Sequence, residues 1–444
     1  MSTLSFSTKT APTPYPLRTF TRIAWFLLGA LFIFSGLIKL NDPVGTALKL
    51  EEYFDIFAAG LPVFSGLFHG LAGSSRLLSI LVSSLEVILG VALLLRWYLR
   101  PTLWVLLALL VFFTFLTFYS AAFNKVTDCG CFGDFIKLTP WTSFAKDVFL
   151  LVLWAIVFFN QRFLRHAFVQ GTAGIMTMTF ASAIAIGIGV RALGHLPYFD
   201  FLPYKVGNNI GKLMKPAEPA RYRYTMTRNG ETKEFDEYPT DSTWKYQAMT
   251  ALNPEKSHPV ITDFEVSDVN GDSYTQELLK GNKMVLIVQN TNKADRDRFE
   301  AINALMTATA RSRKNITALT ITSTRPAKFD SFRHDVNLSG PYYFADATVL
   351  KSIIRSNPGL IILNNGVVQA KYHYHDIPEL FEVAKALAKT FCQPGVWATS
   401  PEPSRLAGGR PTVLSSAIFT DYLRGLPFSR AGHAQAFAPA FPLS

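Results

Sequence analysis

The chain has 444 residues, of which 49% are hydrophobic and 14% are aromatic, and its formal net charge is +11. This length predicts more than one domain. The positive charge is spread along the chain and forms no Lys/Arg-rich cluster interleaved with aromatic residues, which argues against nucleic acid as a partner.

The first part of the chain is dominated by apolar runs. A helix needs about 20 residues to cross the hydrocarbon core of a bilayer, and five runs are near that length. They are Ile23–Leu40, Leu77–Leu95, Thr102–Phe123, Trp141–Phe159 and Thr172–Val190. The fourth run is the weakest, because Lys146 and Asp147 interrupt it. The first run is longer than a typical signal peptide core. Residues 1–195 are therefore predicted to form an α-helical transmembrane bundle of about five helices in a lipid bilayer.

Basic residues predict the orientation of these helices, since Lys and Arg next to helix ends favour the cytoplasmic side. Three segments carry arginines without nearby acidic residues. These are Arg18 and Arg22, Arg96 and Arg100, and Arg162 and Arg165. The prediction is a multi-pass protein of the bacterial cytoplasmic (inner) membrane, with its N-terminus inside and everything after Val190 on the periplasmic side.

Three further regions follow the predicted bundle. Residues 196–256 are interpreted as a linker with a β-hairpin, because alternating residues flank Asn229-Gly230. Residues 257–390 alternate strand and helix patterns, then show a hairpin about Asn365-Gly366 and a closing helix. The fold class is therefore multi-domain, with an extracytoplasmic α/β domain behind the bundle. Residues 391–444 are rich in Pro, Ser, Ala and Gly and are expected to be disordered.

The order of elements in residues 257–390 resembles the thioredoxin fold. In "SNPGLIILNNG" (Ser356–Gly366), Pro358 matches the cis-proline that the fold places just before its hairpin. The resemblance also implies a Cys-x-x-Cys after the first buried strand, but "QNTNKADRDRF" stands there, and no cysteine occurs between Cys131 and Cys392. The interpretation is a thioredoxin-like domain that binds or scaffolds and does no dithiol chemistry by itself.

Two of the three cysteines, Cys129 and Cys131, lie in "TDCGCFGDF" between the third and fourth apolar runs. The predicted topology places them in an oxidising compartment. A Cys-x-Cys pair just reaches the span of a disulfide, Gly130 tolerates the backbone angles that closure needs, and a strained disulfide is labile. This predicts a thiol-exchange site. The alternative is that both cysteines fill a structural loop. No nearby histidine completes a zinc site, so no metal is predicted.

A family resemblance bears on this choice. The segments Leu31–Gly45, "SLEVILGVALLL" and "DCGCFGD" together resemble DoxX-like membrane proteins and, within that group, the methylamine-utilisation protein MauE. The resemblance covers the predicted bundle. It implies a small helical bundle in the cytoplasmic membrane. The MauE group is implicated in maturing a disulfide-rich periplasmic enzyme, which implies disulfide handling at Cys129 and Cys131 with a periplasmic thiol protein as partner.

Glu86 lies midway through the second apolar run, where an ionised carboxylate is costly and usually faces the bundle interior. It is interpreted either as a proton acceptor near a thiol or quinone, or as a hydrogen-bonding group that packs helices; the sequence favours the second. A quinone has no direct support from the sequence, and the cofactor is unknown. Lys39 is interpreted as snorkelling to the outer interface, and His373 and His375 as lying on an exposed strand face without a third metal ligand.

Two functions stay open. The first is thiol–disulfide handling of an oxidoreductase-like kind for a periplasmic partner, with Cys129, Cys131 and Glu86 as its site residues. The second is a non-catalytic membrane scaffold or docking protein in which the "CGC" loop is structural. The sequence does not identify the substrate, the electron acceptor or the oligomeric state.

Overall fold

A computed structural model describes residues 15–123, 133–136, 138–164, 168–312 and 315–388 of the chain. These residues all fall within one compact unit, Met1–Cys392, and Gln393–Ser444 form the other. The three cysteines and the predicted disordered tail lie outside the described residues. The predicted domain boundaries and the disorder of the tail therefore stay predictions.

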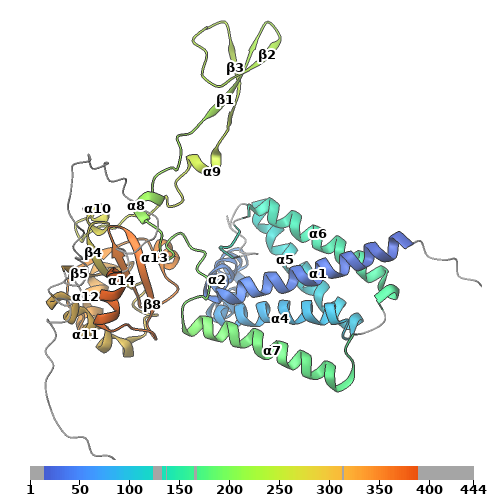
Figure 1. Cartoon of the computed structure of the whole chain (residues 1–444), viewed down its shortest axis with the longest axis horizontal. Coiled ribbons are helices and arrows are strands. Elements are labelled where there is room, and N and C mark those ends of the chain that lie inside the picture. Colours follow the sequence, from blue (N-terminus) through green and yellow to red (C-terminus); the bar gives the residue numbers. More distant parts are fainter. Residues whose placement is uncertain (1–14, 124–132, 137, 165–167, 313–314, 389–444) are drawn as a thin grey trace, which may run out of the picture. The chain divides into compact units, whose positions relative to one another are not determined.

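Among the described residues, five helices are long and apolar enough to cross a membrane. They are α1 (Tyr15–Asn41), α4 (Ser75–Leu95), α5 (Leu99–Phe123), α6 (Pro140–Phe159) and α7 (Gly171–Gly194). Helix α1 packs against α4, α6 and α7, and α5 packs against α6 (Figure 1). The prediction of five apolar helices is therefore confirmed. The physical reason is that a run of apolar residues of this length satisfies its backbone polar groups in a bilayer only as a helix.

Glycines allow α1 and α4 to approach closely. A Cβ atom added to Gly36 would lie 2.8 Å from the backbone oxygen of Ser83, and one added to Gly90 would lie 2.8 Å from the backbone oxygen of Gly29. Such close contact between backbones is a common way to associate helices in a membrane, where no hydrophobic driving force acts between them. This packing sets the distance between side chains at the α1–α4 interface.

Short helices connect the long ones. Between α1 and α4 the chain forms α2 (Pro43–Gly60), the 3₁₀ turn η1 (Pro62–Phe64) and α3 (Ser65–Gly73), and a second 3₁₀ turn, η2 (Gln161–Leu164), follows α6. Asp42 caps the N-terminus of α2, since the Gly45 N–H donates to Asp42 Oδ1 at 2.8 Å. These helices were not predicted, because they are short and their apolar residues follow no long run.

The residues after α7 begin with a small antiparallel sheet. The strands β1 (Tyr222–Arg228), β2 (Glu231–Phe235) and β3 (Lys245–Ala251) pair in the order β2-β1-β3, and the single turns α8 (Ile210–Leu213) and α9 (Pro254–Ser257) flank them. Asn229 and Gly230 both have positive φ angles, as a tight hairpin turn requires. The predicted hairpin is confirmed, and β3 adds a strand that was not predicted.

A five-stranded sheet follows, with the strand order β6-β5-β4-β7-β8. Strands β4, β5 and β6 are parallel, whereas β7 runs antiparallel to β4 and β8. The strands are β4 (Asn282–Val288), β5 (Ile316–Thr322), β6 (Tyr342–Phe344), β7 (Gly359–Asn364) and β8 (Val367–His373). The helices are α10 (Thr275–Leu278), η3 (Arg296–Arg298), α11 (Phe299–Arg311), α12 (Pro326–Asp335), α13 (Ala347–Ile353) and α14 (Leu380–Ala388).

The central strand β4 explains how this sheet is covered on both faces. Val285 and Ile287 belong to one buried cluster, with α13, and Met284, Leu286 and Val288 belong to another, with α11, α12 and α14. Alternate side chains of a strand point to opposite faces, so a strand buried on both faces reads as the continuous run "MVLIV". The Asn357-Pro358 bond is cis, as predicted.

The close α1–α4 packing gives a first prediction. Replacing Gly36 or Gly90 with alanine should lower the free energy of unfolding in detergent by about 1–3 kcal/mol, because the added Cβ would overlap the backbone of the facing helix. Gly187→Ala is the matched control, since no atom lies within 4 Å of a Cβ added there. Denaturant unfolding in micelles measures all three. Equal stability of the Gly36 and Gly187 variants would contradict this account of the packing.

Candidate functional site

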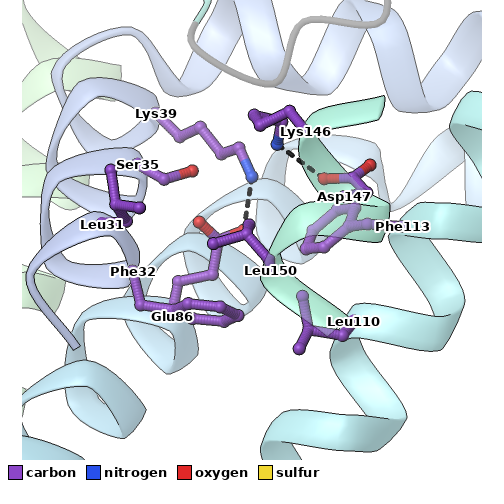
Figure 2. Close-up of a pocket in the computed structure, with 10 residues that line it drawn as sticks. All are labelled: Leu31, Phe32, Ser35, Lys39, Glu86, Leu110, Phe113, Lys146, Asp147 and Leu150. Atoms are coloured by element: carbon purple, nitrogen blue, oxygen red, sulfur yellow. Dashed lines mark hydrogen bonds and ion pairs between the residues drawn. The ribbon is translucent and has the colours of Figure 1, made fainter. Parts of the chain in front are cut away.

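Four charged side chains come together inside the helical bundle. Lys39 lies on α1, Glu86 on α4, and Lys146 and Asp147 on α6, and together they line one pocket (Figure 2). Two positive and two negative groups give the pocket no formal net charge. Charged residues at membrane depth are costly unless they are paired, so their presence together marks a candidate functional site.

Lys39 and Glu86 form the deepest ion pair of the pocket. The Lys39 ammonium contacts Glu86 Oε1, and the two side chains are only 7% and 2% exposed. The ammonium also lies 4.2 Å from the centre of the Phe113 ring on α5. The Lys39 ammonium thus has a carboxylate and an aromatic face as partners, which lowers the cost of burying its charge in the bundle.

Asp147 provides the second carboxylate. Its Oδ1 lies 2.6 Å from Lys146 Nζ, and its Oδ2 accepts a hydrogen bond of 2.9 Å from Thr117 Oγ1 on α5. Asp147 is buried, whereas Lys146 is partly exposed. Both carboxylate oxygens therefore have partners, which lowers the cost of burying the charge.

The cavity between these groups is small, about 30 Å³. Its other lining residues are mostly apolar: Leu31, Phe32, Ser35, Leu110, Phe113 and Leu150 (Figure 2). A cavity of this size with several polar groups on its wall holds about one water molecule. In this conformation the space between the charged side chains is thus suited to water.

The described end of the "DCGCFGD" motif lies against α1. The Phe135 ring contacts the Phe34 ring with a centroid distance of 5.8 Å, and a Cβ added to Gly133 would lie 3.7 Å from Ile38. Phe34 and Ile38 precede the pocket residues Ser35 and Lys39 in the sequence. Cys129 and Cys131, the predicted site residues of this motif, lie outside the described residues.

The structure corrects the interpretation of Lys39 and identifies the partner of Glu86. Lys39 does not snorkel to an interface; it is buried and pairs with Glu86. Glu86 does face the bundle interior, as predicted, and its hydrogen-bond partner is the charged Lys39 on the neighbouring helix α1. Lys146 and Asp147 were noted only as interruptions of an apolar run. The signal that could have found the site was the presence of both charge signs in helices predicted to pack together.

Three histidines gather at a second place, where His195 lies 2.8 Å from Asp376 Oδ2 and His375 Nδ1 lies 2.6 Å from the Gly194 carbonyl oxygen. His373 is buried, so its predicted place on an exposed strand face is wrong. Burial, helped by the nearby His375, lowers the pKa of His373 to about 4. In the described ranges, no three His, Cys, Asp or Glu side chains are arranged to hold a metal ion.

The helices that form the charged pocket belong to a segment that matches a known family. Residues 17–160 match the family described as "Methylamine utilisation protein MauE". This segment is similar to that family, and we call it the MauE-type segment. The match runs from α1 to the end of α6, so the MauE-type segment contains the whole charged pocket and the "DCGCFGD" motif. It supports a multi-pass membrane protein, in agreement with the five apolar helices.

Two solved structures are similar to part of the chain. Both are crystal structures of proteins proposed to act in electron transfer or transport in Aquifex aeolicus VF5, with 13% and 14% sequence identity. Each alignment covers 28% of this chain and 91% of the other, with a TM-score of 0.23, which carries no argument about fold or function. No curated protein matches the chain.

The buried ion pair gives a second prediction. Lys39→Met or Glu86→Leu alone should destabilise the protein by about 3–5 kcal/mol, because each leaves an uncompensated charge in the bundle. The double variant should be more stable than either single variant. Lys49→Met is the control, since its ion pair with Glu52 is on the surface and is worth about 0–1 kcal/mol. Unfolding in detergent provides the measurement, and additive losses in the double variant would rule out the coupling.

The buried histidine gives a third prediction. The unfolded chain binds a proton at His373 near its ordinary pKa of about 6.5, whereas the folded protein does so only near 4. Stability from this group is therefore present above pH 6.5 and lost as the pH falls toward 4. His373→Gln should flatten this fall in melting temperature, and the exposed His258→Gln should not. Melting curves across this pH range test the prediction, and identical slopes in both variants would refute it.

Proposed function

We propose that the chain handles thiols and disulfides for a periplasmic partner protein through Cys129 and Cys131. The observation that carries the proposal is the MauE match, which spans both cysteines together with the charged pocket. The contact of Phe135 with Phe34 supports it further, because it joins the described end of this motif to α1, a helix that also lines the pocket. The MauE resemblance implies a role in maturing a disulfide-containing enzyme.

The proposed orientation places the loop on the periplasmic side of the bacterial cytoplasmic membrane. Arg18 and Arg22 lie near the start of α1, and Arg96 and Arg100 lie in the turn between α4 and α5. Both positions belong to the same end of an antiparallel bundle, and such arginines favour the cytoplasm. The end of α5, which precedes the "CGC" loop in the sequence, lies at the other end of the bundle, as does the end of α7. The N-terminus is then inside, and the α/β region is outside.

The proposed reaction is thiol–disulfide exchange. A thiolate of the partner attacks the Cys129–Cys131 disulfide and forms a mixed disulfide, and a second partner thiolate then displaces the remaining cysteine. The partner gains one disulfide, and its two thiol protons end on Cys129 and Cys131. Glu86 is proposed as a proton acceptor in this site, because it is a buried carboxyl group that lines the pocket beside Lys39. Reoxidation of the pair needs an electron acceptor that the chain does not identify.

The α/β region is proposed to be a thioredoxin-like docking domain without dithiol chemistry. The strand order β5-β4-β7-β8, with parallel β4 and β5 and an antiparallel hairpin, supports this fold, as does the cis bond before β7. Gln289, Asn290 and Thr291 follow β4, where a redox-active thioredoxin would carry its first cysteine. This observation favours the alternative that the protein is a non-catalytic scaffold with a structural "CGC" loop.

The fourth prediction separates these two functions. Replacing Cys129 and Cys131 with serine should change the disulfide state of at least one envelope protein in cells, since exchange requires both sulfur atoms. Cys392→Ser is the matched control and should leave those disulfides unchanged. Mass spectrometry of thiols labelled before and after reduction provides the measurement. An unchanged set of envelope disulfides in the double variant would reject thiol handling and leave the scaffold function.

A further inference from the structure

Among the described residues, five arginines lie at one end of the helical bundle. The Trp25 Nε1 on α1 donates to the Leu93 carbonyl oxygen near the end of α4 at 2.7 Å, so the start of α1 lies beside the end of α4. The short α4–α5 turn and η2, which follows α6, belong to the same end. The arginines of these segments are Arg18, Arg22, Arg96, Arg100 and Arg162. This end of the bundle is therefore strongly positive.

The segments that carry these arginines contain no acidic residue. Residues 1–41, 87–127 and 148–199 include neither Asp nor Glu. On α4 the nearest carboxylate is that of Glu86, ten positions before Arg96, which is about 15 Å along a helix. Glu86 already pairs with Lys39. The bundle therefore supplies no local counter-charge, and an anion from another molecule can neutralise this end.

Arg96 is held in place at this end by aromatic rings and by its backbone. Its guanidinium lies 4.4 Å from the centre of the Trp25 ring on α1 and 4.5 Å from that of Phe168, which precedes α7. The Phe168 N–H donates to the Leu95 carbonyl oxygen at 3.1 Å. Arg96 has a φ of 55°, a left-handed conformation that a non-glycine residue keeps only where its surroundings fix it. Its charge is thus well positioned.

Arg22 adds a second positive charge beside Arg96. Residues three and four positions apart share one face of a helix, so Arg18, Arg22 and Trp25 form a row on α1. Burial lowers the pKa of Arg96, and the nearby Arg22 lowers it further. Arginine does not release its proton in proteins. The repulsion between the two guanidinium groups therefore persists until an anion joins them.

The side chains around this pair of arginines are apolar or aromatic and are exposed. On α1 they are Phe20, Ile23 and Phe26, and near Arg96 they are Tyr98 and Phe168. Aromatic side chains with a polar group, such as tyrosine, are typical of the level of the lipid headgroups. A ligand that combines an anionic phosphate with long apolar chains therefore matches this surface better than a small soluble anion does.

We propose that this end of the bundle binds an anionic phospholipid, with the headgroup phosphate between Arg22 and Arg96 and the acyl chains along the exposed apolar residues of α1. The planar guanidinium presents several N–H donors in a geometry that suits phosphate oxygens. Basic pockets between membrane helices bind such headgroups. Under the proposed orientation the site faces the cytoplasmic leaflet, which contains anionic lipids. The inference does not depend on thiol handling.

The fifth prediction concerns the lipid that the full chain retains. In micelles with equal amounts of phosphatidylglycerol and phosphatidylcholine, the wild type should retain mainly phosphatidylglycerol, because the arginines repel the choline cation. Arg22→Gln should lower the ratio of bound phosphatidylglycerol to phosphatidylcholine about tenfold, since one charge-assisted contact with the phosphate is lost. Arg22→Lys should keep most of the preference, because it keeps the charge. Native mass spectrometry counts the bound lipids.

Arg191→Gln is the matched control and should leave the lipid ratio unchanged, because Arg191 lies in the last turn of α7, at the other end of the bundle. Arg22 is exposed, so Arg22→Gln should melt like the wild type in phosphatidylcholine alone. A lower melting temperature there would mean that Arg22 supports the fold and would count against the proposal. Equal retention of both lipids by the wild type would overturn it, as would equal losses in Arg22→Gln and Arg191→Gln.

A phosphate dissolved in water is the other source of the same anion, and a competition experiment separates it from the lipid. An excess of inorganic phosphate should not displace the bound phosphatidylglycerol, because burial of the acyl chains along α1 also contributes to binding. Complete displacement by inorganic phosphate would assign the arginines to soluble anions and reject the lipid site. High concentrations of sodium chloride should weaken the preference for phosphatidylglycerol, since exposed charges are screened by salt.

Discussion

The pairing of buried charges is the constraint on which the rest of this protein depends. A lone charge inside a membrane bundle is too costly to keep, so Lys39 and Glu86, and Lys146 and Asp147, can exist there only as pairs. The close approach of α1 and α4 at Gly36 and Gly90 makes the first pair possible. Helix packing and the electrostatics of the pocket therefore depend on each other. The glycines allow α1 and α4 to pack closely, and separation of the two helices would break the ion pair.

Buried charges are also paired where the chain leaves the apolar helices. Arg355 neutralises Asp42 and Asp134, and Lys371 pairs with Asp200, so three residues that immediately follow or connect apolar helices find their counter-charges in the α/β region. Most exposed ion pairs in proteins contribute little, but these cations are almost fully buried. Removing these cations would leave carboxylates unpaired in partly buried positions. We therefore expect these ion pairs to contribute more to stability than exposed surface pairs do.

The proposed function assigns different roles to the MauE-type segment and to the α/β region. The MauE-type segment carries the cysteines and a small pocket suited to water, whereas the α/β region carries neither a cysteine nor a described metal site. The α/β region contacts the described end of the "DCGCFGD" motif through the ion pair between Arg355 and Asp134. Under the scaffold alternative the same contacts hold a structural loop, and the pocket serves only to pack helices.

The sequence by itself determined the elements whose signal is local. Long apolar runs predicted all five membrane helices, and the Asn229-Gly230 and Asn365-Gly366 pairs predicted two hairpins. The cis bond at Pro358 was implied by the resemblance to the thioredoxin fold and not by a local pattern. Only the tertiary structure decided the partners of the charged residues. Lys39 meets Glu86 across 47 positions, and Arg355 meets Asp134 across 221 and Asp42 across 313. The reason is physical. The periodicity of a helix or strand is a property of residues that are neighbours in the sequence, whereas an ion pair depends on how elements far apart in the sequence pack together. No local sequence pattern predicts that packing.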